Sequence, residues 1–189
     1  KPPLHKGGEG DLKSKTYILA WTTTPWTLIG NVALAVGKDI DYIKIKVKDD
    51  FYIIAKDIYE NLYNRDSKDS LKLAFDLEYA DNKKEGEKSS KIENPVKEFK
   101  GSDLIDKSYK PLFDYYLKDE KLENRENGWK IYAGDFVTTE EGTGVVHIAP
   151  AFGEDDMNLG KKYNLPFIQH VGMDGVIKAE VKDFAGLNV

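Results

Sequence analysis

Short apolar runs separated by turn signals are the feature that most limits what this 189-residue chain can fold into. The clearest runs are residues 32–36, the alternating residues 42–47 and residues 51–55, which are divided by Gly-Lys-Asp and Asp-Asp. Short runs rich in β-branched and aromatic residues, with such turns between them, are typical of strands joined by hairpins. We therefore expect a mainly β fold whose successive strands form a barrel or a curled sheet.

Four further strands are expected, at residues 16–24, 71–79, 129–137 and 145–149. Pro25 would end the first of these in a turn, because a proline holds the preceding residue in an extended conformation. The segment Gly142-Thr143-Gly144 is expected to link the last two strands tightly. Apolar spacing indicates a helix over 56–64, and acidic residues suited to a first helical turn indicate another over 153–163. These helices would flank the strands.

Two stretches differ in composition from the rest of the chain. Residues 1–10 are rich in proline and glycine and lack the apolar core of a signal peptide, so we expect a linker there. Residues 81–100 carry six lysines and five acids with few apolar side chains, which favours an exposed excursion over a phosphate-steering patch. We expect the variable excursion as a whole to span about residues 64–100. We expect residues 1–189 to be a single domain excised from a longer protein.

Composition excludes several classes of function. The chain has no cysteine, which removes disulfides, thiolate nucleophiles, zinc fingers and iron–sulfur clusters. A formal net charge of −5 argues against holding nucleic acid by bulk electrostatics, so a nucleic-acid partner would need a local site. Apolar runs fall far short of the ~20 residues that span a bilayer, and we expect no membrane partner.

The chain offers few candidates for covalent or metal chemistry. No serine lies in a Gly-x-Ser-x-Gly turn, so water is the expected attacking group in any hydrolysis. Gly142-x-Gly144 lacks the third glycine and the following helix of a dinucleotide site. His147 with Glu154, Asp155 and Asp156 could hold one hard cation, and this metal site remains an alternative to a site without metal.

The most unusual run is Trp21-Thr-Thr-Thr-Pro-Trp-Thr27. On an extended segment Thr22 and Thr24 point to one side and Thr23 to the other, so one face offers neighbouring hydroxyls that donate and accept hydrogen bonds. The residues alone leave the role open, since threonine is also an ordinary strand residue. The same holds for His147 in an apolar strand and for acids at a helix start.

Two long segments together resemble a known family. Trp21-Thr-Thr-Thr-Pro-Trp-Thr-Leu-Ile-Gly-Asn31 and Gly142-Thr-Gly-Val-Val-His-Ile-Ala-Pro-Ala-Phe-Gly-Glu-Asp-Asp156 resemble the two signature segments of the editing domain inserted in isoleucyl-tRNA synthetases. The resemblance extends from about residue 11 to the end, apart from the excursion. Valyl and leucyl relatives usually carry Thr-Thr-Arg-Pro at 22–25 and His-Asp at 152–153, so the isoleucyl type fits better and a valyl-type editing domain is an alternative.

The resemblance implies a barrel-like β core with flanking helices and hydrolysis of tRNA(Ile) that carries valine by mistake, with valyl-adenylate as a further candidate substrate. A pocket shaped for isoleucine cannot strongly exclude the smaller valine, so a second, hydrolytic site is needed. The ATP-binding signatures of the synthetase body are absent, so we expect no ligase activity and no cofactor. The expected partners are the tRNA 3′ end and the rest of the parent synthetase, for a cytoplasmic monomer.

The resemblance also implies site residues. Asp156 would hold the α-ammonium of the misattached amino acid through a charge-assisted hydrogen bond, with Thr23 and Thr24 completing the catalytic set. His147 would line the side-chain pocket and exclude isoleucine by size, and backbone N–H groups near the threonines or Gly142–Gly144 would stabilise the oxyanion. Asp155 matches a less informative acid. The expected substrate-binding residues are Trp21, Thr22, Thr27, Asn31, His147, Ile148, Ala149 and Phe152. A non-catalytic module that binds the aminoacylated tRNA end, and a metal-dependent esterase, are the competing functions.

Overall fold

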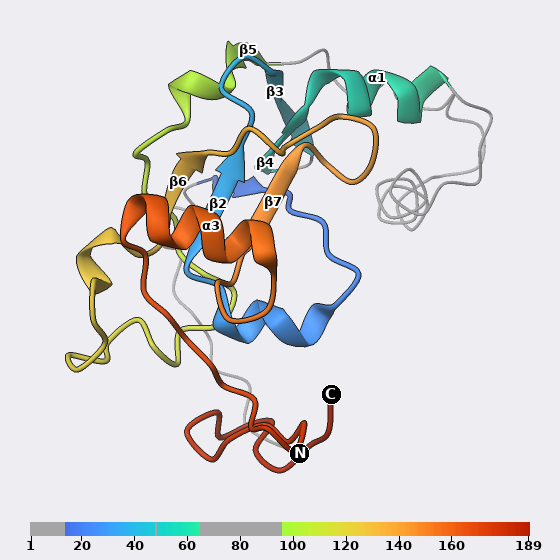
Figure 1. The fold of residues 1–189 in the computed structure, drawn as a ribbon. Helices are drawn as coiled ribbons and strands as arrows, with labels where there is room; N and C mark the ends of the chain where they lie inside the picture. The colour runs from blue at the N-terminus through green and yellow to red at the C-terminus, as the bar shows by residue number, and fades with distance from the viewer. Residues whose placement is uncertain (1–13, 48, 65–95) are drawn as a thin grey trace, which may run out of the picture.

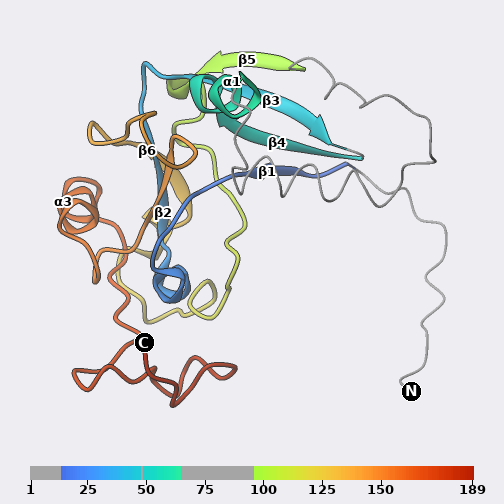
Figure 2. The ribbon, with the colours of Figure 1, turned by 90° about the vertical axis from the view of Figure 1, so that its right-hand side faces the viewer.

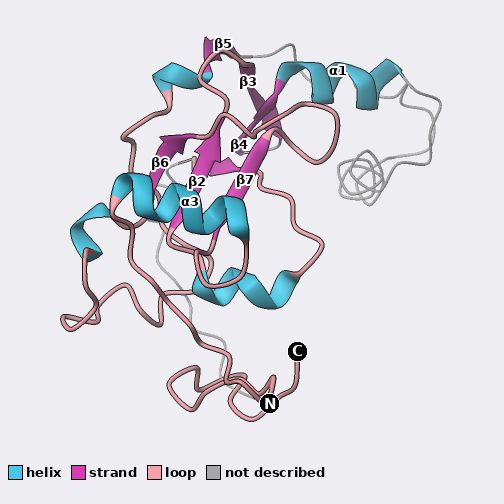
Figure 3. Ribbon diagram, viewed as in Figure 1, coloured by secondary structure: helices cyan, strands magenta, loops and turns pink. Residues whose placement is uncertain are grey.

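The computed structural model describes residues 14–47, 49–64 and 96–189. The helices in this part are α1 (Lys56–Asn64) and α3 (Glu154–Tyr163), with short 3-10 helices η1 (Pro25–Gly30), η2 (Gly101–Asp103) and η3 (Arg125–Asn127). The expected mainly β fold with flanking helices is confirmed, with long loops between the elements (Figures 1 and 3). The strands are β1 (Thr16–Ile18), β2 (Ala33–Val36), β3 (Asp41–Val47), β4 (Asp50–Ala55), β5 (Lys97–Lys100), β6 (Lys130–Ala133) and β7 (Val145–Ile148).

The first sheet, called sheet A here, has the strand order β1-β4-β3-β5. β3 and β4 form the antiparallel hairpin that the alternating run and the Asp-Asp turn predict. β1 lies parallel to β4 on one side, and β5 lies antiparallel to β3 on the other. Residues 97–100, which we expected at the end of the exposed excursion, therefore form an edge strand of this sheet.

The second sheet, sheet B, has the order β6-β2-β7. β2 is parallel to β6 and antiparallel to β7, and all four of its residues are buried. The prediction that Gly142–Gly144 tightly links these two strands is wrong, because β6 ends at Ala133, β7 begins at Val145, and β2 lies between them in the sheet. The physical reason is burial: a strand that is apolar on both faces belongs at the centre of a sheet, so β2 takes the place between them.

Sheet B lies between sheet A and α3 (Figure 2). Leu34 and Val36 of β2 pack in one core cluster with Ile43 and Ile54 of sheet A. Ala33 and Ala35, on the opposite face of β2, pack in a second cluster that includes Leu159 of α3. The alternation of side chains along β2 thus connects the two cores.

Other expectations had mixed outcomes. The strand expected at residues 16–24 is ordered as β only over Thr16–Ile18, after which Trp21 makes an isolated bridge and Pro25 begins η1, a position that suits proline. The helix predicted over 56–64 is confirmed as α1, and the one predicted over 153–163 as α3. The linker 1–10, the strand at 71–79 and most of the excursion lie outside the described residues.

No closed barrel is found among the strands of the described segments, which form two separate sheets, so the barrel stays a prediction. In those same segments no helix has both the length and the apolar character needed to cross a membrane.

Candidate functional site

The two signature segments meet along β7. Trp21 makes a parallel bridge with Val146, which places the threonine run directly beside the strand that carries His147. The hydroxyl of Thr143 donates to the carbonyl of Leu19 at 2.6 Å and fastens the glycine-flanked segment 142–144 to the same chain segment. In Figure 1, η1 is the blue helix below β2 and β7. Local pairing therefore brings together residues more than a hundred positions apart.

A continuous series of hydrogen bonds runs from the threonines to the histidine. Thr22 Oγ1 accepts from the backbone N–H of Thr24 at 3.1 Å, and Thr27 Oγ1 donates to the carbonyl of Thr24 at 2.8 Å. Thr27 Oγ1 also lies 2.9 Å from His147 Nε2, across 120 residues of sequence. The hydroxyls of Thr24 and Thr27 are 3.4 Å apart. Thr27 is thus the junction between η1 and β7.

The hydrogen bonds of Thr27 determine the tautomer of His147. The single hydroxyl hydrogen of Thr27 points to the Thr24 carbonyl, so we assign the contact with His147 to donation from an Nε2–H group. Burial lowers the pKa of His147, against the opposing influence of Asp156, and so favours the neutral ring. Its Nδ1 is buried with no hydrogen-bond partner in the described part of the chain. The ring is held as an oriented, uncharged group.

Asp156 lies in the first turn of α3, which follows the loop after β7. Its Oδ1 accepts a hydrogen bond from the backbone N–H of Ala149 at 2.6 Å, which fixes the carboxylate to the loop that follows β7. Burial raises the pKa of Asp156, while the Ala149 hydrogen bond and the nearby His147 lower it. A side chain at position 153 would collide with Asp156 Oδ2, so Gly153 leaves room for the carboxylate.

Asn31 is held within the protein at the end of η1. Its side-chain amide donates to the carbonyl of Ala33 at 2.8 Å, and its Oδ1 accepts a short hydrogen bond from the Tyr109 hydroxyl. The Trp129 indole donates to its backbone carbonyl at 3.1 Å. This arrangement fixes the passage from η1 into β2. Contact of Asn31 with a substrate stays a prediction.

The remaining predicted residues divide into exposed and packed ones. Trp21, Thr23 and Thr24 are exposed beside the hydrogen-bonded series. Ile148 and Ala149 are almost completely buried, Ile148 within the core between sheet B and α3, and their roles as pocket walls stay predictions. Phe152 packs edge-on against Trp26 with ring centroids 5.1 Å apart.

His170 also packs against this region, which the sequence did not predict. Its ring centroid lies 4.8 Å from that of Phe152, and its Nε2 lies 3.0 Å from the carbonyl oxygen of Trp26. No spacing relates His170 to either signature segment, so no sequence signal was available for it. Trp26, by contrast, belongs to the first signature.

Metal ligation was an alternative for the acids of α3. Within residues 14–47, 49–64 and 96–189, no three or more histidine or acidic side chains are grouped so that they could hold a metal ion. The hydrogen-bonded groups above are therefore what the site offers a ligand: hydroxyls, one neutral imidazole and one carboxylate. Such a set suits a polar ligand that carries a positive charge.

Comparison with known proteins gives consistent relatives. The chain is 38% identical over 173 residues to an isoleucine–tRNA ligase of Clostridium tetani, which covers 92% of this chain and 14% of the relative. The isoleucine–tRNA ligase of Treponema denticola is 39% identical over 188 residues, or 96% of this chain and 15% of the relative. The ligase of Rickettsia felis is 42% identical over 180 residues, or 95% and 14%.

A solved structure supports the fold. The crystal structure of GlLeuRS-CP1 matches with a TM-score of 0.54 and 18% identity, over 79% of this chain and 45% of that one. No protein-family model matches the chain. The chain spans about one seventh of the length of the curated relatives it matches.

Proposed function

This chain belongs to the isoleucine–tRNA ligase family, and on that premise we propose that it is the family's editing domain, which hydrolyses tRNA(Ile) carrying valine. The relatives argue for the isoleucyl rather than the valyl-type alternative. Its partners would be the 3′ end of the charged tRNA and the rest of the synthetase, with the domain acting as a monomer in the cytoplasm. Valyl-adenylate is a further candidate substrate.

Recognition of the amino acid would begin at Asp156. An aminoacyl ester keeps a free α-ammonium group, and a carboxylate held in a fixed position gives it a charge-assisted hydrogen bond. Oδ1 is already held by Ala149, so the side chain need not be ordered when the ligand binds. The absence of a side chain at Gly153 leaves the space that Asp156 Oδ2 occupies.

Hydrolysis itself needs a water held beside the ester carbonyl. Thr23 and Thr24 are exposed next to the buried Thr27–His147 hydrogen bond, and their hydroxyls can orient a water without ionising. We assign them that role, while Thr22 and Trp21 would contact the terminal adenosine. The negative charge of the tetrahedral intermediate requires N–H donors, which we expect from the backbone of these segments.

Selection of valine over isoleucine would depend on His147. Its ring is neutral, buried and fixed by Thr27, which is the behaviour of a rigid wall rather than of a base. A fixed wall rejects the larger isoleucine by steric clash, whereas a pocket shaped for isoleucine only loses contacts with the smaller valine, which is worth about 1–3 kcal/mol.

One observation carries the proposal. Thr27 Oγ1 and His147 Nε2 lie 2.9 Å apart, so the two signatures meet in space, and the charge of the nearby Asp156 opposes the lowering of the pKa of the same histidine. A wider separation would have left hydroxyls and carboxylate unable to contact one ester.

The test is deacylation of Val-tRNA(Ile) compared with Ile-tRNA(Ile). We expect the chain to hydrolyse the valyl ester selectively, and Asp156→Asn to lose most of this activity, because the amide still accepts from Ala149 but carries no charge. Asp155→Asn is the matched control, since it removes the same charge from the neighbouring, exposed position. Equal hydrolysis of both esters, or full activity in Asp156→Asn, would contradict the proposal.

The competing functions give different results in the same experiment. A binding module would retain a nonhydrolysable valyl-adenosine analogue without cleaving the charged tRNA at high protein concentration. A metal-dependent esterase would lose activity in EDTA and recover it with added divalent cation.

A further inference from the structure

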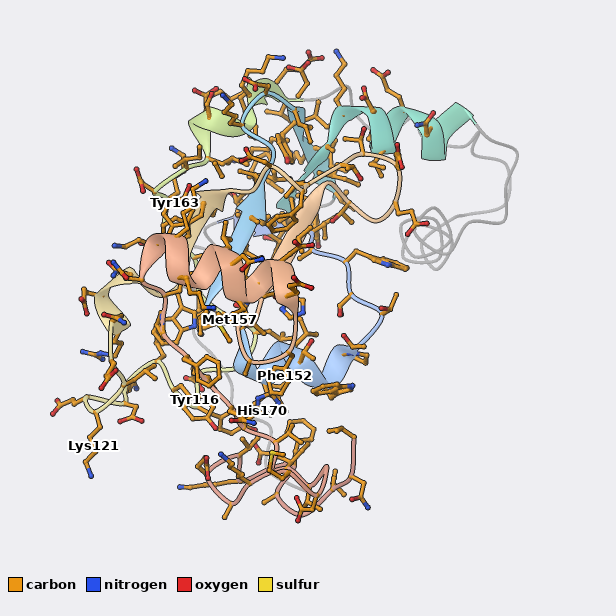
Figure 4. The ribbon with its side chains drawn as sticks, in the orientation of Figure 1. Tyr116, Lys121, Phe152, Met157, Tyr163 and His170 are labelled. Atoms are coloured by element: carbon orange, nitrogen blue, oxygen red, sulfur yellow. The ribbon has the colours of Figure 1, made fainter. Side chains whose placement is uncertain are left out.

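We propose that His170 is a positioning residue of the site, which holds η1 against the loop between β7 and α3 and thereby sets the distance between Thr27 and Asp156. The inference rests on the proposed function for its kinetic test. Figure 4 shows His170 next to Phe152, below α3. His170 comes from the segment after α3, which carries neither signature.

The first contact is with η1. His170 is fully buried, and its Nε2 lies 3.0 Å from the carbonyl oxygen of Trp26. A carbonyl oxygen only accepts, so the ring must donate from an Nε2–H group. Trp26 immediately precedes Thr27, and the hydrogen bond therefore holds the peptide unit from which the Thr27 hydroxyl reaches His147.

The second contact is with the loop that leads to Asp156. The His170 ring meets Phe152 edge-on with centroids 4.8 Å apart, and Phe152 in turn meets Trp26 at 5.1 Å. The three rings lie in mutual contact, since the Trp26 and His170 centroids are 6.5 Å apart. Phe152 is three residues after Ala149, whose N–H holds the Asp156 carboxylate.

The third contact is with Gly30 of η1, against which the His170 ring packs closely. A Cβ atom at Gly30 would lie 3.0 Å from His170 Nδ1 and 3.1 Å from a ring atom of Phe152. The imidazole therefore fills the space that a side chain on η1 would otherwise occupy. Its Nδ1 is buried and has no hydrogen-bond partner in the described part of the chain. One ring thus touches both segments that carry the site, and a change of its shape or hydrogen bonding must alter their spacing.

The test compares three variants. His170→Leu keeps much of the volume and loses the donor, whereas His170→Gln keeps a donor of similar reach. Val181→Ala loosens the apolar cluster against which Trp26 and Phe152 pack, without touching the hydrogen bond. We expect His170→Leu to lower kcat for Val-tRNA(Ile) up to about tenfold, the equilibrium cost of one lost neutral hydrogen bond, with a much smaller change in KM. His170→Gln should recover most of the loss, and Val181→Ala should lose stability but not kcat.

A second readout does not depend on activity. The imidazole nitrogens of His147 can be followed by NMR, and we expect their chemical shifts to move in His170→Leu and to return in His170→Gln. Unchanged shifts, or a kcat for His170→Leu equal to that of the wild type, would overturn the positioning role. A wild-type chain that does not deacylate would refute the proposed function, and the His147 shifts would then still decide the inference.

Discussion

Thr27 shows how much of the site depends on a single hydroxyl. It donates to the Thr24 carbonyl and accepts from His147, so it holds both the turn of η1 and the orientation of the imidazole. The group is buried, and water therefore cannot replace it without rearrangement.

Replacing Thr27 by valine should therefore destabilise the protein. Valine keeps the shape but leaves the His147 Nε2–H buried without an acceptor, at a cost of about 1–3 kcal/mol in the free energy of unfolding. Urea unfolding measures this loss, and Thr27→Ser, which restores the hydroxyl, is the control. Equal stability of Thr27→Val and the wild type would show that the hydrogen bond with His147 does not form.

Gly153 gives a second prediction for a single residue. In Gly153→Ala the new methyl would displace the Asp156 carboxylate, which then loses both its hydrogen bond from Ala149 and its place at the site. We expect deacylation to fall about as far as in Asp156→Asn, with the free energy of unfolding lowered by about 1 kcal/mol for the lost hydrogen bond. The double variant should lose no more activity than Asp156→Asn alone, because both changes act on one carboxylate. Additive losses would refute this interpretation.

The signatures could be read from the sequence, whereas their contacts could not. The resemblance pointed to Asp156, His147 and Thr27, but a hydrogen bond across 120 residues depends on how the strands pair. His170 was beyond prediction because its role comes from tertiary packing alone. The same packing shows Asn31 and Ile148 to be held within the protein, which a list of matched positions does not reveal.

At the scale of elements, the junction between the two sheets is formed by the glycine-flanked segment before β7. Gly144 has φ +72°, and a side chain there would overlap the Cβ of Ala55 at the end of β4. Its carbonyl accepts from the Tyr42 hydroxyl at 2.5 Å, and Ala55 N–H donates to Thr143 at 3.0 Å. Burial raises the pKa of Tyr42 to about 12, so the hydroxyl remains a donor at ordinary pH.

Gly144→Ala should accordingly lower the free energy of unfolding far more than the same substitution at Gly175. Gly175 has a similar φ of +77° but nothing within 4 Å of its Cβ position, so Gly175→Ala measures backbone strain alone, about 1 kcal/mol. We expect Gly144→Ala to cost at least about 2 kcal/mol more, since overpacking adds to strain. Similar unfolding free energies for the two variants would mean that the sheets separate easily at this point.

The existence of most strands was predictable, and their partners were not. Alternating and apolar runs identified β2, β3, β4 and β7 because periodicity reflects local geometry. The neighbours of β2 lie about a hundred residues away, and burial on both faces, rather than any turn signal, selects them.

For the whole molecule, two buried histidines determine how stability responds to acid. Burial lowers the pKa of both His147 and His170 from 6.5. Asp156 faces the first, and Lys178 and Glu180 act on the second. Unfolded histidines bind protons near pH 6.5 while the folded ones do not, so the free energy of unfolding should fall as the pH decreases below about 6.5, by at most about 1.4 kcal/mol per pH unit for each histidine.

Asp156 acts in the opposite direction at lower pH. Its pKa is raised above 3.8, so the folded state binds that proton first and regains some stability as the pH approaches 3.8. Urea unfolding at several pH values between about 7.5 and 5 would check the histidine effect. His170→Gln, which does not titrate, should show a shallower decline, and a wild-type stability that rises on acidification in this range would refute the expectation.

The central place of β2 also has a consequence for synthesis of the chain. Ala33–Val36 leaves the ribosome about a hundred residues before either of its two partner strands is translated. Until Lys130–Ala133 emerges, a fully apolar segment has no partner strand in sheet B, and contacts so distant in sequence form slowly. Sheet B is therefore completed only after Val145–Ile148 has emerged, and until then the nascent chain exposes a segment that chaperones can bind.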